Sequence, residues 1–295
     1  MPSFRSKLVF WVTKGVVGAF YNPNASIQRI RKEFALTTKL IPQKKSGKFE
    51  QVWIDGMLAL WVIPEKVTTD KVVLYFHGGG YSVCSPDTHK NMCSMMAKYS
   101  ETKFILIDYR LAPENPFPAA NQDALKAYTW LRKTYAPEKI IFGGDSAGGG
   151  LALSALLSLK ESGETLPSKV FCVSPWLDLA STGESYESNR YSDAYIDYES
   201  IRNWSVHYAP ESMHKNPLVS PLYGDPTGLP PMMIHVSSSE ILKSDSIEFA
   251  EKAKNAGVEI NLEVWDDMVH VWQMWTGILP EALQSIQKLA NFIKA

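Results

Sequence analysis

The sequence predicts an α/β fold in which a mostly parallel central sheet is flanked by helices. Short runs of apolar and β-branched residues alternate with longer segments of helical periodicity, and these runs are too short for an average helix. The repeated order of strand, helix and strand is typical of parallel strands joined by crossover helices. The 295 residues are enough to build one large hydrophobic core.

The first two strands are expected to form an antiparallel hairpin. Residues 49–53 and 57–63 flank Asp55-Gly56, a dipeptide suited to a tight turn because glycine tolerates positive φ. Six further strands, buried and parallel, are expected at residues 72–76, 104–108, 140–142, 170–174, 232–236 and 260–264. Helices are expected at about residues 89–99, 119–135, 147–161, 244–256 and 280–293, the fourth of them ending at Gly257.

Two segments do not follow this alternation: residues 1–40 and residues 184–215. Insertions in α/β domains gather over the carboxyl edge of the sheet, where ligands bind. We therefore expect both segments to form a helical cap, with ordinary surface helices as the alternative. Residues 41–183 and 216–295 then form the two parts of the core domain.

Composition excludes several classes of protein. The 30 Lys and Arg residues against 31 Asp and Glu residues give a net charge of −1, which argues against nucleic-acid binding by bulk charge. No apolar run approaches the roughly 20 residues of a membrane span, and the apolar run at residues 8–12 is too short for a signal peptide. Three widely spaced cysteines, Cys84, Cys93 and Cys172, indicate reduced, buried thiols, no metal site and a cytoplasmic protein.

A Gly-x-Ser-x-Gly motif lies between the strand expected at 140–142 and the following helix. Gly144 and Gly148 leave room for a close backbone approach, and a sharp turn there would expose the hydroxyl of Ser146 above the sheet. Ser146 is therefore the predicted nucleophile. The backbone N–H of Ala147, at the start of the helix, is a predicted oxyanion donor. A glycine-rich nucleotide-binding turn is the alternative.

A second glycine motif, His77-Gly78-Gly79-Gly80, follows directly after the strand expected at 72–76. In lipases and esterases this motif supplies the other part of the oxyanion hole. The two motifs together favour acyl transfer over nucleotide binding.

With these motifs the sequence resembles the hormone-sensitive-lipase-like family of esterases within the α/β-hydrolase superfamily. Two further segments carry the resemblance: Asp-Tyr-Arg-Leu-Ala-Pro-Glu at residues 108–114 and Pro-Leu-Val-Ser-Pro-Leu at residues 217–222. It extends from about residue 70 to the C-terminus. The resemblance implies an α/β-hydrolase fold with a helical cap and a carboxylesterase that needs no cofactor and hydrolyses short- to medium-chain esters. It also implies oxyanion donors at Gly79 and Gly80, a turn at Gly78 and a structural role for His77.

In this superfamily the order along the chain is serine, acid, histidine, which places the base after Ser146. His235 lies in an expected strand, and His207 and His214 lie in or beside the expected cap. His270 follows the last strand, in the loop from which this fold presents its base, so it is the predicted general base.

The predicted acid is Glu240, in the loop after the strand at 232–236, where the family usually has Asp. A glutamate can also hold the imidazole tautomer and stabilise its positive form. Asp245 is the rival, and Asp266 and Asp267 are weaker candidates because they are suited to a turn. Two carboxylates in family motifs, Asp145 and Glu114, are expected to be buried and to brace loops without a catalytic part.

Aromatic residues near the motifs or in the cap are candidates for an apolar substrate pocket, although core packing would explain them equally well. They are Tyr81, Trp176, Tyr195 and Trp204, with Tyr191 and Trp272 beside them. The stretch around Leu8, Trp11, Val12 and Val16 is amphipathic, and a cap helix packed on the core is a simpler interpretation than a membrane-surface helix. The evenly mixed composition shows no sign of a large exposed apolar lid.

Three functional alternatives stay open. A lactonase or an amidase would use the same triad in a differently shaped pocket. The third is a protein of this fold that binds a ligand without turning it over. The plant gibberellin receptors resemble this fold and are of that kind, but they lack the triad histidine, whereas this chain has His270. The resemblance also implies a homodimer paired through the strand at 260–264.

Overall fold

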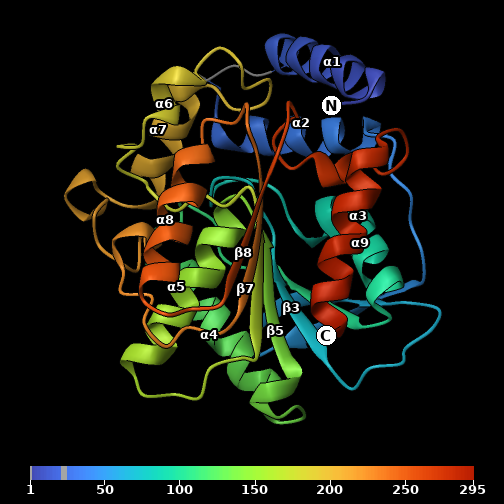
Figure 1. Ribbon diagram of the computed structural model, residues 1–295, viewed down its shortest axis with the longest axis vertical. Coiled ribbons are helices and arrows are strands. Elements are labelled where there is room, and N and C mark those ends of the chain that lie inside the picture. The colour runs from blue at the N-terminus through green and yellow to red at the C-terminus, as the bar shows by residue number, and fades with distance from the viewer. Residues whose placement is uncertain (1, 21–24) are drawn as a thin grey trace.

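The computed structural model describes residues 2–20 and 25–295, and within them eight strands form one sheet in the order β1-β2-β4-β3-β5-β6-β7-β8 (Figure 1). β1 pairs antiparallel with β2, β2 pairs antiparallel with β4, and every other pairing is parallel. The strands are β1 (Lys48–Ile54), β2 (Met57–Ile63), β3 (Val72–Phe76), β4 (Lys103–Ile107), β5 (Ile140–Asp145), β6 (Lys169–Val173), β7 (Met232–Ser237) and β8 (Ile260–Trp265). The predicted α/β fold and its eight strands are confirmed.

The hairpin between β1 and β2 has the predicted two-residue turn. Ile54 pairs with Met57, and the two residues between them, Asp55 and Gly56, have φ angles of 45° and 85°. Two consecutive positive φ angles suit the right-handed twist of the flanking strands, and aspartate followed by glycine is a favoured pair for this turn.

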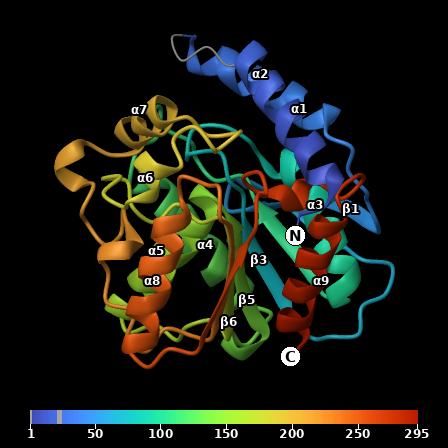
Figure 2. The same cartoon turned by 45° about the horizontal axis from the view of Figure 1, so that its top comes forward.

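Helices cover both faces of the sheet (Figures 1 and 2). α4 (Ala119–Leu131), α5 (Ala147–Glu161) and α8 (Lys243–Asn255) pack on one face, and α3 (Pro86–Ser100) and α9 (Pro280–Lys294) pack on the other. α3 begins three residues before its predicted start because Ser85 and Thr88 form a capping box with Pro86 at the first helical position. α8 ends before Gly257, whose φ of 79° fits the predicted helix terminator.

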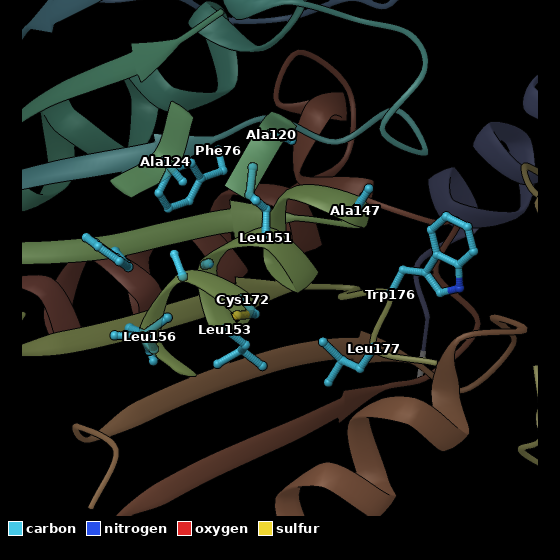
Figure 3. Packing of buried hydrophobic residues seen from close by; sticks show 14 of the residues in the cluster. Phe76, Ala120, Ala124, Ala147, Leu151, Leu153, Leu156, Cys172, Trp176 and Leu177 are labelled. Atoms are coloured by element: carbon cyan, nitrogen blue, oxygen red, sulfur yellow. The ribbon is translucent and has the colours of Figure 1, made fainter. Parts of the chain in front are cut away.

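Each face has its own hydrophobic core. Leu151, Leu153 and Leu156 of α5 pack against Ala120 and Ala124 of α4 and against the strands (Figure 3). The second core lies between the sheet and α3 with α9. Because both faces are covered, the central strands are apolar on both sides; all five residues of β3 are buried.

The remaining helices lie over one end of the sheet, where β3 and β5 end (Figures 1 and 2). They are α1 (Phe4–Phe20), α2 (Ile27–Leu40), α6 (Ser185–Ser188) and α7 (Tyr198–Tyr208), from the two segments for which the sequence predicts a cap. Short 3-10 turns at Pro137–Lys139, Glu211–Met213, Pro221–Tyr223 and Trp272–Trp275 complete the described elements. In the described part of the chain no helix is both long and apolar enough to cross a membrane.

One arginine attaches α2 to the core. The guanidinium of Arg31 donates to both carboxylate oxygens of Glu114, at 2.9 and 2.6 Å, and to the carbonyl oxygens of Ser82 and Ala112, at 2.8 and 2.9 Å. Glu114 is therefore exposed at the junction between core and cap, and the expectation that it is buried was wrong. The planar guanidinium suits this site because its donors diverge in a fixed fork.

Replacing Arg31 by alanine should loosen α2 with little effect on the core. We expect limited proteolysis within residues 1–45 of Arg31→Ala to be about tenfold faster, equivalent to ~1.4 kcal/mol of local stability. Arg29→Ala is the matched control because Arg29 pairs only with Glu33 of the same helix among the described residues. Equal cleavage rates in the two variants would show that Arg31 does not hold α2.

Candidate active site

Ser146 lies in a sharp turn between β5, which ends at Asp145, and α5, which begins at Ala147. Its φ and ψ angles are 53° and −126°, an unfavourable conformation for a residue with a side chain. Its N–H donates to the carbonyl of Val173 at 2.9 Å, and its carbonyl accepts from the N–H of Trp176 at 3.0 Å. The end of β6 and the loop after it thus hold the strained turn from both sides.

Gly148 lets α5 begin close to β3. A Cβ atom at this position would collide with the carbonyl oxygen of Phe76, at the end of β3. Any other residue would push the first turn of α5 away from the sheet, so glycine is required here for steric reasons. Ala147, as the first residue of α5, presents one of the backbone N–H groups that have no partner within a helix.

Gly79 and Gly80, which follow β3, form another wall of the site that contains Ser146. Gly79 has a φ of 112°, and its carbonyl accepts from the N–H groups of Ser82 and Val83, both at 2.9 Å. Among the described residues, the backbone N–H groups of Gly79 and Gly80 have no hydrogen-bond acceptor. Both glycines line one cavity with Ser146 and His270.

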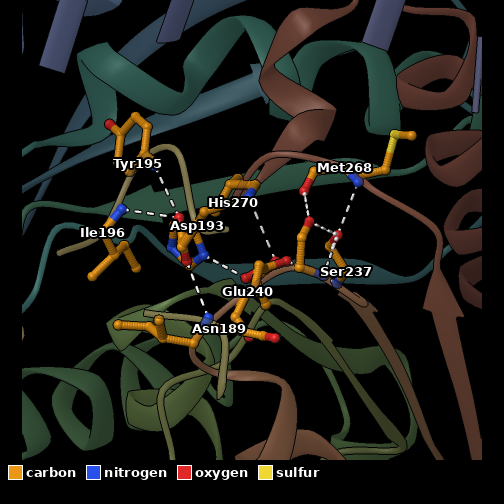
Figure 4. Close-up of polar contacts among 12 residues, drawn as sticks. Asn189, Asp193, Tyr195, Ile196, Ser237, Glu240, Met268 and His270 are labelled. Carbon is orange, nitrogen blue, oxygen red and sulfur yellow. Dashed lines mark hydrogen bonds and ion pairs between the residues drawn. The ribbon is translucent and has the colours of Figure 1, made fainter. Parts of the chain in front are cut away.

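His270 and Glu240 form a short buried contact. The distance from Nδ1 of His270 to Oε2 of Glu240 is 2.6 Å, and both side chains are almost fully buried (Figure 4). The other carboxylate oxygen accepts from the hydroxyl of Ser174 at 2.7 Å and from the N–H of Ser237 at 2.8 Å. A carboxylate that accepts at Nδ1 fixes the proton there and leaves Nε2 as the free basic nitrogen of the neutral ring.

This environment favours the charged form of His270. Burial opposes a positive charge, but the attraction of Glu240 and the hydrogen bond from the imidazole outweigh burial and raise the pKa of His270 above its usual value. Asp193 adds to the attraction. Burial raises the pKa of Asp193 itself to about 6.

The segment between α6 and α7 fixes the loop that carries Glu240. The side-chain amide of Asn189 donates to the carbonyls of Ser238 and Glu240, at 2.9 and 2.7 Å. Asp193 accepts from the N–H of Ile241 at 3.1 Å and, with its other oxygen, from the N–H groups of Tyr195 and Ile196 (Figure 4). The position of Glu240 therefore depends on the segment over the sheet as well as on the sheet.

These supporting residues are absent from the prediction made from the sequence. Ser174 directly follows β6, so the rule that located His270 at the carboxyl edge of the sheet could also have found it. Asn189 and Asp193 carry no comparable signal, because polar residues are common throughout their segment.

The rival acids lie elsewhere. One carboxylate oxygen of Asp245 accepts from the N–H groups of Leu177 and Asp178, at 2.8 and 2.9 Å, and from the hydroxyl of Tyr186 at 3.1 Å. Burial and the neighbouring Asp178 raise the pKa of Asp245 well above its usual value. Asp266 and Asp267 are exposed after β8. The structure thus brings Glu240, and none of these three aspartates, to hydrogen-bonding distance of His270 among the described residues.

The other histidines have structural contacts. Nδ1 of His235 lies 2.8 Å from the hydroxyl of Ser285, His214 contacts the carbonyl of Ala209 at 2.9 Å, and His207 lies on α7. His77 stacks on Tyr109 with ring centroids 4.3 Å apart, and burial lowers the pKa of His77 to about 3, so its ring is neutral.

Asp145 is buried, as expected, and braces the turn. Its oxygens accept from the hydroxyl of Tyr75 at 2.7 Å and contact Nε2 of His89 at 3.0 Å. Burial raises its pKa, but attraction to His89 and the hydrogen bond between them outweigh burial and lower it. A Cβ atom at Gly78 would collide with this carboxylate, and one at Gly144 with the carbonyl of Gly148.

Two neighbouring cavities lie over this site. The reaction cavity, with a volume of about 40 Å³, contains Ser146 and His270. The apolar cavity, with a volume of about 230 Å³, lies between α1, α2 and α7. Six residues line both cavities and therefore form the junction between them: Phe34, Thr38, Ile41, Tyr195, Trp204 and Trp275.

Only part of the predicted aromatic pocket lines these cavities. Tyr195 and Trp204 line both. Tyr81 and Trp176 belong to the hydrophobic core instead, because Tyr81 stacks on Tyr208 at 3.7 Å and the indole of Trp176 is buried with its N–H on a backbone carbonyl. Tyr191 is 83% exposed and Trp272 is fully buried, so neither forms the pocket.

The cysteines are free thiols. Cys93 and Cys172 are buried as expected, but Cys84 is only partly buried and lines the reaction cavity. Burial raises the pKa of Cys84 to about 12, which keeps this thiol protonated and weakly nucleophilic. Across the described residues, no group of histidine, cysteine and acidic side chains is arranged to hold a metal ion.

Comparison with known proteins identifies the family. A family model described as the alpha/beta hydrolase fold matches residues 73–274. This chain belongs to the α/β-hydrolase family. A solved esterase of the bacterial hormone-sensitive lipase family superposes on this α/β-hydrolase with a TM-score of 0.94 and 37% identity, covering 100% of this chain and 98% of that one. The resemblance drawn from the sequence motifs is thus confirmed.

Two further relatives have similar sequences. An acetyl-hydrolase from Streptomyces hygroscopicus is 36% identical over 244 residues, which are 82% of this chain and 81% of the relative. An esterase from Acinetobacter venetianus is 34% identical over 256 residues, which are 86% of this chain and 84% of the relative. Each of these relatives matches more than four fifths of this α/β-hydrolase.

Removing the charge of Glu240 should reverse the pKa shift of His270. In Glu240→Gln the attraction of Glu240 and its hydrogen bond are lost, while burial and the attraction of Asp193 remain, so the pKa of His270 should fall clearly below its wild-type value. In the wild type, the raised pKa contributes stability that is present below about pH 6.5 and is lost as the pH rises through the folded-state pKa. NMR titration of the imidazole measures both values.

Asp245→Asn serves as the control for this titration, because Asp245 contacts Leu177, Asp178 and Tyr186. Its His270 should retain the raised pKa. A pKa that stayed raised in Glu240→Gln would contradict the assignment of the shift to Glu240.

Proposed function

We propose that this α/β-hydrolase is a serine carboxylesterase that hydrolyses short- to medium-chain esters with Ser146, His270 and Glu240. The observation that carries the proposal is the 2.6 Å contact between His270 and Glu240 in the cavity that also contains the strained Ser146. Two relatives of similar sequence are an acetyl-hydrolase and an esterase, which supports the same class of reaction.

The first half-reaction forms an acyl-enzyme. Nε2 of His270 takes the proton from the hydroxyl of Ser146 while Oγ attacks the ester carbonyl. The negative charge on the carbonyl oxygen is stabilised by the N–H groups of Gly79, Gly80 and Ala147, and each such donor is worth roughly 10²–10³ in rate. The imidazolium then gives its proton to the leaving alcohol.

The second half-reaction releases the acid. Water enters, His270 removes a proton from it, and the hydroxide attacks the acyl carbonyl. The same N–H groups stabilise the second oxyanion, and the proton returns from His270 to Ser146 as the carboxylic acid leaves. Glu240 stabilises the imidazolium in both steps, in agreement with the raised pKa of His270. The chemistry requires no cofactor.

The substrate size follows from the cavities. The reaction cavity is small, and its junction with the apolar cavity offers the chain of a substrate an apolar path away from Ser146. Each methylene group that enters contributes about 0.8 kcal/mol. We therefore expect the preferred substrates to be esters whose acyl chain passes the junction but does not fill the apolar cavity.

A series of p-nitrophenyl esters from acetate to palmitate tests the activity. We expect the highest kcat/KM at short to medium chains, and a loss of about 10⁴-fold or more in Ser146→Ala. Glu240→Ala should lose a similar factor, whereas folded Asp245→Asn should keep most of the activity. A folded protein that hydrolysed none of these esters would refute the proposal. Lactones and amides would then be tested as substrates, and ligand binding without turnover would be tested after them.

Filling the junction should shorten the preferred acyl chain. Ile41 lines both cavities, so the larger side chain of Ile41→Trp should lower kcat/KM for octanoate about tenfold more than for acetate. Ile41→Val, which leaves the junction open, is the control. An unchanged ratio between the two esters in Ile41→Trp would place the acyl chain elsewhere.

The homodimer and the cytoplasmic location stay predictions. β8 ends the strand order, so its outer edge is the surface through which two sheets would pair. Light scattering that returned a monomer at micromolar concentration would rule out the dimer.

A further inference from the structure

The helix α1 exposes four large apolar side chains, although it also buries Val9 and packs Phe10 against the core. Phe4, Leu8, Trp11 and Val12 are exposed by 84%, 50%, 68% and 44%. The side of α1 that faces the protein carries Ser6, Val9 and Thr13, and two of these three are hydroxyl residues. A helix that only packed on a core would show the opposite arrangement, with the apolar side inward.

This orientation is held by specific contacts. The N–H and the hydroxyl of Ser3 donate to the carboxylate of Glu281, at 2.8 and 3.1 Å. The guanidinium of Arg5 donates to the carbonyl of Ile278 at 3.1 Å. Both partners lie at the start of α9, so the beginning of α1 is fixed to the core with its large apolar side chains outward.

The exposed apolar surface continues onto α2. Leu36 and Leu40 are exposed by 62% and 70%. Large contiguous apolar patches on a protein surface mark interaction sites. We call this surface the N-terminal face and define it by Phe4, Leu8, Trp11, Val12, Leu36 and Leu40.

Positive charge is concentrated around the N-terminal face. Residues 1–45 contain nine lysines and arginines and one acidic residue, a net charge of +8, whereas the whole chain has a net charge of −1. Lys7, Lys14, Lys32 and Lys39 of α1 and α2 are exposed. Lys14 lies 6.0 Å from the ring of Trp11, so charge and apolar surface are adjacent.

The N-terminal face surrounds the opening of the apolar cavity. Leu8, Val12 and Leu40 are exposed and also line that cavity. At its inner end the cavity shares its junction residues with the reaction cavity. An apolar molecule entering between α1 and α2 would therefore move toward Ser146 along a lining that is mainly apolar.

We propose that the N-terminal face docks on an anionic lipid surface and that the apolar cavity receives ester substrates from it. Basic residues near such a surface each contribute about 1 kcal/mol, and tryptophan is favoured at the boundary between lipid and water. A second copy of this chain is a poorer partner, because the two segments 1–45, each with an excess of positive charge, would repel each other. The delivery of substrate rests on the proposed function, whereas the docking does not.

Vesicle binding tests the docking. Ser146→Ala protein, which leaves the lipid intact, is sedimented with vesicles of phosphatidylcholine alone and with vesicles of equimolar phosphatidylcholine and phosphatidylglycerol. We expect binding to the anionic vesicles at least tenfold tighter, and a further loss of about tenfold or more when Phe4→Ser and Trp11→Ser are added. The matched control is Trp53→Ser, since Trp53 on the edge strand β1 is 66% exposed and should not affect binding.

A pair of charge reversals tests the electrostatic part. Lys7→Glu with Lys14→Glu should weaken binding to the anionic vesicles about tenfold and reduce its dependence on salt. Lys133→Glu with Lys254→Glu changes the net charge equally at exposed positions outside α1 and α2, and should have little effect. Equal effects of the two pairs would show attraction by overall charge and overturn the proposed face.

Enzyme activity separates docking from catalysis. With Ser146 intact, Phe4→Ser with Trp11→Ser should hydrolyse a dissolved p-nitrophenyl ester at the wild-type rate, because neither residue lines a cavity. It should hydrolyse an octanoate ester carried in anionic vesicles about tenfold more slowly than the wild type. If no ester is hydrolysed but vesicle binding persists, the proposed function fails and the docking stands.

Two results would overturn the docking. One is equal binding of the wild type to neutral and anionic vesicles, or binding to neither. The other is a dimer in sedimentation velocity that Phe4→Ser with Trp11→Ser converts to a monomer while vesicle binding is unchanged, which would assign the N-terminal face to a second copy. Circular dichroism and thermal unfolding of each variant exclude loss of α1 as the cause.

Discussion

The buried carboxylate of Glu240 is the point at which the separate parts of the molecule meet. Ser174, after β6, and Ser237, at the end of β7, bind one of its oxygens, and His270, after β8, binds the other. The segment between α6 and α7 holds the backbone of the same loop through Asn189. An unpaired carboxylate would be costly at this depth, so the folded state depends on all of these contacts. The sheet, the loops at its carboxyl edge and the helices over it are thereby fixed relative to the imidazole.

The α2 helix links this site to the outside of the protein. Its inner side carries Phe34 and Thr38 at the junction of the two cavities, Ile41 follows directly after it there, and its outer side carries the exposed Leu36 and Leu40. Arg31 fixes the helix to the loops that follow β3 and β4. Because Arg31 and the packing of Phe34 against Tyr195 and Trp204 hold the same helix, the size of the junction and the shape of the outer surface depend on shared contacts.

The sequence predicts the features that follow from local pattern. The strands, the hairpin turn at Asp55 and the turn at Ser146 each have a signature within a few residues, and the position of His270 follows from the rule on the carboxyl edge of the sheet. It does not predict features that depend on segments far apart in the chain. The contact of Asp193 with Ile241 joins two such segments, and residue type alone does not distinguish the buried Tyr81 from Tyr195 in the cavities. The outward side of α1 was missed for the same reason: amphipathic periodicity gives an apolar side but not the direction in which that side points.

The arrangement around Glu240 also limits which residues can replace it in evolution. Its two oxygens are held on opposite sides, by the pair of serines and by the imidazole, so the length of the side chain is specified as closely as its charge. An aspartate on the same backbone would be shorter by one methylene group and would give up one set of partners. A change between these two acids would therefore need a compensating shift of the loop that Asn189 and Asp193 hold. At this position the two acidic residues belong to different backbone geometries, and a substitution that preserves charge would still be a structural change.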